Sequence, residues 1–283
     1  MTETFLEPFQ FEFFRNGLIV ATLAGALCGL VGTYVVLKGM SYIGHGLSHA
    51  IFGGFAASAL LGVNLFLGAG VWGFASALMI GGVTRRRAIG SDAAIGVITT
   101  ASFALGLALI KVFGSAGKNA DSYLFGNVLG VDTAQVVLVS VVSILAVAVV
   151  FLAYRPLLFS TFDPEVADVS GVRTARIDAL LMLLLAATIL ATMNVLGVTL
   201  VAATLVIPPV IARMLTNSFS RMLVLSTAIG TASGFTGMVA SYHLDIAPGP
   251  MIVLTGSALF AVVFLATGVG GLRRVGALDA DLA

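Results

Sequence analysis

Charged side chains are scarce in this sequence, since Asp, Glu, Lys and Arg make up only 10% of its 283 residues. A soluble globular domain carries about 25% of such residues. Between Lys38 and Arg85 none occurs across 46 residues. This scarcity excludes a water-soluble protein. Together with 59% hydrophobic residues and a mean hydropathy of +1.10, it predicts an all-α polytopic membrane protein.

Three further absences narrow the class. Cysteine occurs once, as Cys28 within the first apolar stretch, so an intrachain disulfide framework is excluded. The net charge is only +1, which predicts no nucleic-acid partner. The first segment, MTETFLEPFQFEFFRNG, holds three glutamates and no basic residue before Arg15, so we do not expect a cleavable signal peptide.

Charge-free intervals of about 20 residues, the length of a membrane-spanning helix, cover most of the chain. They comprise residues 16–37, 41–63, 65–83, 93–113, 133–154, 179–212, 222–242 and 250–272. The interval 179–212 is long for one span, and residues 194–197 offer a turn in its middle. The sequence therefore predicts eight or nine spans in a single transmembrane domain over residues 1–283.

The basic residues favour nine spans with the N-terminus outside and the C-terminus in the cytoplasm of a plasma-membrane protein. That topology places 11 of the 14 basic residues on the cytoplasmic side, which is the usual bias. They are Lys38, Arg85, Arg86, Arg87, Arg155, Arg173, Arg176, Arg213, Arg221, Arg273 and Arg274. Arg15, Lys111 and Lys118 remain outside.

The longest cytoplasmic loop, residues 155–178, contains the signals of a short helix. Asp163 can cap its start, Pro164 fits the first position, Glu165 suits the positive end of the helix dipole, and Gly171 can end it. This helix would expose Val166, Val169 and Ala167. Two turns of helix are not stable alone in water, so it must lean on its own spans or on a partner, and the loop length favours a partner.

Two of the three histidines, His45 and His49, lie in the long charge-free run. Residues four apart share one face of a helix, so the two imidazoles form a chelating pair for a transition metal. An ionisable residue inside a membrane span is a functional candidate. A metal pathway is the favoured interpretation, with a proton relay and purely structural histidines as alternatives. In a two-fold dimer the same helix of a second copy would raise the ligand count to four.

The third histidine, His243, lies beside Asp245 at the predicted outer end of a span. The two side chains are candidates for guiding a cation to an entrance. The alternative interpretation, a solvated loop end, is favoured.

Several stretches together resemble the permease subunits of zinc/manganese-type metal ABC importers, a type II importer-like architecture. The matching stretches are VVLKGMSYIGHGLSHAIFGG, SDAAIGVITTASFALGLALI, DSYLFGNVLGV, FDPEVADVSGV, NVLGVTLVAATLVIPPVIARML and SYHLDIAPGPMIVL. They occur in order and cover most of the chain.

The resemblance implies a homodimer with two cytoplasmic ABC ATPase subunits and an extracytoplasmic metal-binding protein. It also implies that residues 162–171 form the helix that couples the permease to the ATPase. The metal site of the family uses an Asp and a His four residues apart on the second span, positions that correspond to His45 and His49. His45 therefore stands where the family usually has Asp, an exchange that costs manganese more than zinc.

The sequence therefore predicts a transport subunit, not an enzyme, that imports zinc or manganese, with iron as a further candidate. The metal is cargo, no covalently bound cofactor is expected, and ATP would act on the partner because the chain has no P-loop. The rival hypothesis is a gradient-driven metal/proton transporter with the histidines as proton carriers. It is weakened because no pair of intramembrane acidic residues is evident. An enzyme with an intramembrane metal would need a carboxylate beside the histidines, and none lies between Lys38 and Arg85.

Overall fold

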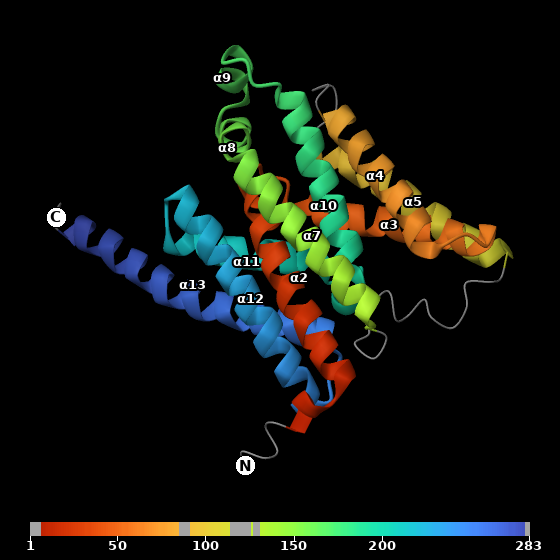
Figure 1. Ribbon diagram of the computed structural model, residues 1–283. Coiled ribbons are helices and arrows are strands. Elements are labelled where there is room, and N and C mark those ends of the chain that lie inside the picture. Colours follow the sequence, from red (N-terminus) through yellow and green to blue (C-terminus); the bar gives the residue numbers. More distant parts are fainter. Residues whose placement is uncertain (1–6, 85–90, 114–125, 127–130, 281–283) are drawn as a thin grey trace.

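The computed structural model describes residues 7–84, 91–113, 126 and 131–280, and this part of the chain contains helices and no strand (Figure 1). The helices are η1 (Glu7–Gln10), α2 (Glu12–Leu37), α3 (Ser41–Leu61), α4 (Leu65–Thr84), α5 (Ser91–Phe113), α7 (Thr133–Leu152), α8 (Tyr154–Phe162), α9 (Pro164–Val169), α10 (Thr174–Leu196), α11 (Val201–Leu215), α12 (Phe219–Leu244) and α13 (Pro248–Ala280). The all-α prediction is confirmed for the described residues.

Six of the described helices are long and apolar enough to cross a membrane: α2, α4, α7, α10, α12 and the Pro248–Gly268 part of α13. Two shorter apolar helices are Ala93–Leu109, within α5, and Val201–Leu215. The multi-span architecture is thus confirmed, whereas eight or nine crossings stay a prediction.

The predicted break in the 179–212 interval is present. Helix α10 ends at Leu196 and α11 begins at Val201, with Gly197 between them at a φ of +80°. A positive φ of this size suits glycine, which has no Cβ to clash with the backbone. The turn residues 194–197 lie next to one another in the sequence, so this break could be predicted without knowledge of the fold.

The predicted span 133–154 extends too far at its C-terminal end. Helix α7 ends at Leu152, and a separate helix, α8, begins at Tyr154 after a bend at Ala153. Arg155 marked the end of the charge-free interval, but the helix axis turns before that charge. The sequence does mark this break with Pro156, because proline clashes with the carbonyl four residues before it, that of Leu152, and fits the first turn of a new helix.

Helices α2 and α12 pack with their backbones in close contact. Gly25 and Gly230 face each other, and a Cβ on either would collide with the carbonyl of the other. Nearby, the Ser226 hydroxyl donates a 2.6 Å hydrogen bond to the carbonyl oxygen of Gly29. Small residues and interhelical hydrogen bonds of this kind hold helices together in lipid, where burial of apolar surface adds little.

Aromatic contacts identify the two ends of this bundle. At one end α2 and α7 finish and α12 begins, and there the ring of Phe219 lies 5.6 Å from that of Tyr34 and 5.7 Å from that of Tyr154. We call this the Lys38 end. At the opposite end the ring of Phe14, near the start of α2, lies 5.3 Å from that of Tyr242, near the end of α12. From the Lys38 end, α3 runs across α10 toward α4 and α5 (Figure 1).

Candidate functional site

A tight turn joins α2 to α3 and sets where α3 begins. Lys38, Gly39 and Met40 each donate a backbone hydrogen bond of 2.9 to 3.1 Å to a carbonyl in the last turn of α2. Gly39 has a φ of +68°, and the first turn of α3 closes when the Ile43 amide donates to the Met40 carbonyl at 2.9 Å. The short, fully bonded turn places His45 in the second turn of α3.

The rings of His45 and His49 lie together as the i,i+4 spacing predicts. Their centroids are 4.3 Å apart, and Nδ1 of His49 lies 2.8 Å from the carbonyl oxygen of His45. A carbonyl oxygen can only accept, so Nδ1 of His49 carries the hydrogen and Nε2 keeps its lone pair. Fixing the tautomer through the other ring nitrogen is how proteins orient a metal-ligating histidine.

Glycines on α3 let two neighbouring helices approach next to the histidines. A Cβ on Gly44 would lie 3.0 Å from Cδ1 of Leu205 in α11, and one on Gly46 would lie 2.8 Å from Cγ2 of Thr99 in α5. The ring of His49 also meets the ring of Phe103 in α5 edge-on, with 4.7 Å between centroids. His49 is consequently half-buried, whereas the side chain of His45 is exposed.

The described residues of one chain provide an incomplete metal site. They contain no group of three or more His, Cys, Asp or Glu side chains placed to hold a metal ion. The hydroxyl of Ser48 is not spare, because it donates to the carbonyl of His45 at 2.8 Å. The described part of α3 therefore offers a metal ion two imidazole rings, of which that of His45 is exposed.

His243 and Asp245 lie far along the fold from this pair. They flank the junction of α12 and α13, where Asp245 adopts a φ of +53° after the end of α12. The ring of His243 contacts that of Tyr242, with centroids 5.6 Å apart. This junction is at the end of the bundle opposite the Lys38 end (Figure 1), so the two predicted sets of residues belong to different places.

The short helix predicted in the 155–178 loop is present as α9. Its cap is as expected: Oδ1 of Asp163 accepts from the Val166 amide at 2.9 Å, Pro164 occupies the first turn, and Glu165 follows it. Gly171 has a φ of +84°, which suits its predicted role after the helix end. The cap at Asp163 and the turn at Gly171 depend on residues close in the sequence. The sequence therefore located this helix within a residue or two.

Two of the three apolar residues expected on the outer face of α9 are there. Val169 is 90% exposed and Val166 is 49% exposed. The prediction for Ala167 is wrong, because its side chain is fully buried. Helix α9 leans on α8 and α10 with that face. It therefore packs on its own chain and still presents an apolar patch.

A polar cluster that the sequence did not reveal lies beside this segment. Nζ of Lys38 lies 2.8 Å from Oδ1 of Asp178 at the start of α10, and it also donates to Ser160 in α8. The residues are 122 and 140 positions from Lys38, so no local pattern could connect them. In the sequence Lys38 and Asp178 look like ordinary charges at the ends of spans.

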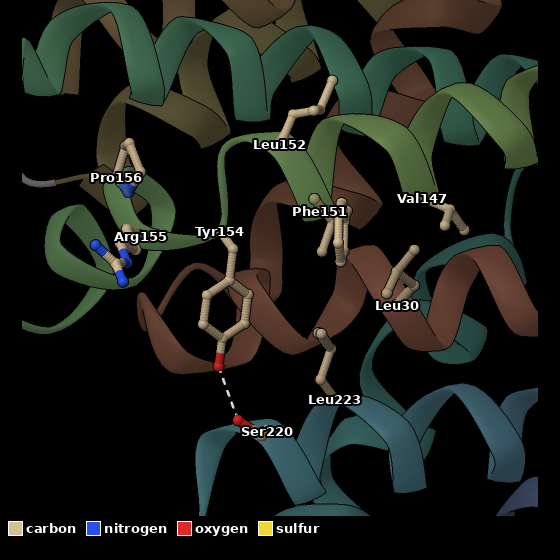
Figure 2. A pocket seen from close by; sticks show the side chains of 10 residues that line it. Leu30, Val147, Phe151, Leu152, Tyr154, Arg155, Pro156, Ser220 and Leu223 are labelled. Atoms are coloured by element: carbon tan, nitrogen blue, oxygen red, sulfur yellow. Dashed lines mark hydrogen bonds between the residues drawn. The ribbon is translucent and has the colours of Figure 1, made fainter.

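A cavity of about 700 Å³ lies near the same end, away from the histidines (Figure 2). Its lining is mainly apolar and comes from α2, α7, α8 and α12: Leu30, Val147, Val150, Phe151, Leu152, Tyr154, Arg155, Pro156, Ser220 and Leu223. Figure 2 shows the Tyr154 hydroxyl pointing at Ser220, and the two oxygens are 2.8 Å apart. The cavity separates the α7–α8 bend from α12.

Known proteins resemble this chain along nearly its whole length. A manganese transport system membrane protein, MntC of Listeria monocytogenes, is 36% identical over 256 residues, covering 90% of this chain and 91% of that protein. A probable iron transport system membrane protein of Haemophilus influenzae is 36% identical over 262 residues, covering 93% and 96%. A solved structure described as PsaBC from Streptococcus pneumoniae in complex with Fab matches with a TM-score of 0.83 at 33% identity, covering 93% of this chain and 95% of that chain.

The family model described as the ABC 3 transport family matches residues 10–267. This span includes both histidines of α3, the whole of α9 and the polar cluster around Lys38. It also agrees with the family that the sequence stretches indicated. The chain therefore belongs to the ABC 3 transport family.

Proposed function

We propose that this chain is the membrane permease subunit of an ATP-driven importer of a divalent transition metal ion. Its family membership and relatives named for manganese and iron transport support this function. The observation that carries the proposal is the pair of imidazoles on α3, 4.3 Å apart between centroids, with Nδ1 of His49 already bonded and Nε2 available. Zinc, manganese and iron are all ions that such nitrogens accept.

The transported ion would sit between two copies of the chain. One copy presents two nitrogens, and the exposed ring of His45 leaves the site open to a neighbour. A two-fold axis beside α3 would bring four nitrogens together, a ligand set suited to zinc. A conduit must also release its ion, and a site shared between two subunits can be opened by moving them apart.

The ATPase subunits would dock on the apolar face of α9. Val166 and Val169 are both exposed there on one short helix, and neighbouring exposed apolar side chains of this kind are what a protein partner covers. The chain itself contains no P-loop, so ATP binding and hydrolysis belong to the partner.

The same end of the bundle would face the cytoplasm, with the C-terminus inside and the N-terminus outside. Lys38, Arg155, Arg173 and Arg176 lie on or beside α8 and α9, and such an excess of basic residues is typical of the cytoplasmic side. The α12–α13 junction with His243 and Asp245 would then face the extracytoplasmic metal-binding protein.

The test is metal uptake into proteoliposomes that contain the permease with its ATPase. The double change His45→Ala and His49→Ala should reduce ATP-dependent uptake of zinc, manganese and iron to background, while membrane insertion and ATPase binding stay at the level of the unaltered chain. Tyr42→Phe is a matched control, because it alters the exposed ring next to His45 and leaves both imidazoles in place. Full uptake by the double variant would refute the metal role of the pair.

The rival hypothesis of a gradient-driven transporter is addressed by the same preparation. Liposomes that hold the permease alone, under an imposed proton gradient, should show no metal uptake. Uptake under these conditions would replace the ATP-driven proposal.

A further inference from the structure

The ammonium group of Lys38 uses all three of its donor positions within the protein. It lies 2.8 Å from Oδ1 of Asp178, 3.1 Å from the hydroxyl of Ser160 and 3.0 Å from the carbonyl oxygen of Ser160. The Ser160 hydroxyl in turn donates to Oδ1 of Asp178 at 3.0 Å. Ser160 is buried, and the Lys38 side chain is only 12% exposed. A fully bonded, largely buried ammonium fixes the relative positions of α2, α8 and α10.

On one side the cluster is continuous with the exposed patch of α9. Ser160 lies one turn before Asp163, and the Asp163 amide donates to the Phe159 carbonyl at 2.9 Å. The Asp163 carbonyl then accepts from the Ala167 amide at 3.0 Å, so α8 and α9 are bonded through this residue. We call α8 and α9, residues 154–169, the arm. A shift of α9 must carry Ser160 with it unless these backbone bonds break.

On the other side the cluster is continuous with the histidine helix. Lys38 belongs to the three-residue turn that is closed by backbone hydrogen bonds to α2, and α3 starts at Ser41 directly after it. His45 is seven positions from Lys38, less than two helical turns beyond the start of α3. A force on the Lys38 side chain is therefore applied at the point from which α3 leaves α2.

The arm is loosely packed on one side. The cavity of about 700 Å³ lies between the α7–α8 bend and α12, and the Tyr154–Ser220 hydrogen bond crosses its edge (Figure 2). Close-packed interfaces resist displacement, whereas an interface that borders a cavity loses less packing when its parts move. The Lys38 cluster thus connects the arm firmly to α2 and α10, next to a loosely packed contact between the arm and α12.

We infer that Lys38, held by Asp178 and Ser160, is a positioning residue that transmits displacement of the arm to α3 and so to the metal-binding imidazoles. This inference rests on the proposed function, in which an ATPase moves α9. Lys38 does not touch the metal. It makes the position of the histidine helix depend on the position of the arm.

The test measures how many metal ions are moved for each ATP hydrolysed by the reconstituted complex. In Lys38→Met, a chain of similar length without charge, ATP hydrolysis should continue, while metal moved per ATP should fall about tenfold, in the usual range for coupling between sites. Ser160→Ala keeps the ion pair and should give a smaller fall. The exchanged pair, Lys38→Asp with Asp178→Lys, restores the ion pair but not the bond to the Ser160 carbonyl oxygen, because a carboxylate cannot donate, so it should recover only part of the lost coupling.

Arg155→Met is the matched control, because Arg155 is an exposed basic residue of the arm for which the described part of the structure shows no ion pair. It should leave the ratio unchanged. A merely structural cluster would lower the thermal stability and yield of Lys38→Met and leave metal per ATP at the wild-type value, and that result overturns the inference. Should Lys38→Met fail to fold, Ser160→Ala and the exchanged pair carry the same test. If the unaltered complex moves no metal at all, the proposed function fails instead.

Discussion

The α2–α12 interface and the arm are built in opposite ways. Between α2 and α12 the backbones touch, since Gly25 and Gly230 leave no space for even a Cβ. The arm borders a cavity between the α7–α8 bend and α12. It contacts the bundle through individual side chains: Leu157 is fully buried, the ring of Phe162 meets that of Phe219 in α12, and Lys38 and Tyr154 form polar bonds. One region is held by close backbone packing along two helices, and the other by fewer side-chain contacts beside a cavity.

This difference teaches which part of the permease can move. Separating α2 from α12 would break backbone contacts along both helices, so this pair is expected to travel as one body. Moving the arm rearranges fewer contacts, and its outer face carries Val166 and Val169 for a partner to hold. The permease thus combines a rigid α2–α12 pair with a more mobile arm, and α3 begins next to the Lys38 contact between them.

The largest effect on folding is expected from Gly230→Leu, which breaks the rigid side of the comparison. The new side chain must force α12 away from the Gly25 carbonyl, and we expect a loss of at least about 3 kcal/mol, the upper range for overpacking. The yield and unfolding temperature of the purified chain measure it. Gly96→Leu is the control, because a Cβ at Gly96 meets no atom within 4 Å. Equal losses in both variants would mean that the α2–α12 contact is not special.

The next effect is expected at the partner face of the arm. Val166→Asp places a carboxylate in an apolar contact and should weaken ATPase binding by at least about tenfold, as loss of a central interface contact does. Insertion of the permease itself should not change, since Val166 is 49% exposed and buries little of the core. Co-purification of the ATPase with a tagged permease measures it.

Val166→Ile, which keeps an apolar side chain at the same place, should retain the ATPase. Binding of the ATPase to the Val166→Asp variant at wild-type strength would show that the partner docks elsewhere on the chain. The arm would then need another explanation for its exposed valines.

The same comparison explains what the sequence could reveal. Features set within a few residues were predictable: the i,i+4 histidines, the Asp163 cap and the break at Gly197. The bend at Ala153 was missed because the span was bounded by charge alone, although Pro156, a helix breaker four residues after Leu152, marks where α7 ends. Ala167 was placed on the wrong face because the sequence does not show on which side α9 leans.

The Lys38 cluster illustrates the limit most clearly. Its members come from three helices, and a lysine at the end of a span is explained well enough by the membrane boundary alone. Only the fold shows that this ammonium is bonded at every donor position and largely buried. The exposure of His45 likewise followed from how α3 packs, since α11 meets it at Gly44 and α5 meets it at Gly46.

The smallest expected effect, a change of selectivity without loss of transport, concerns the helix that joins the two regions. His45→Asp introduces the carboxylate that the family resemblance leads us to expect at this position, and it keeps the i,i+4 spacing with His49. Carboxylate oxygen suits manganese, whereas imidazole nitrogen suits zinc, so uptake should shift toward manganese. A shift of roughly tenfold in the manganese-to-zinc ratio corresponds to about 1.4 kcal/mol of differential binding. Competition uptake with both metals measures it.

His45→Asn separates the charge of that carboxylate from its shape. Asparagine has nearly the same size but no negative charge, so it should lower uptake of both metals and should not favour manganese. If His45→Asp and His45→Asn gave the same manganese-to-zinc ratio as the unaltered chain, His45 would not contact the transported ion. His49, whose tautomer is set by the bond of Nδ1 to the His45 carbonyl, would then be the sole ligand that α3 contributes, because that bond uses the backbone of His45 and survives any change of its side chain.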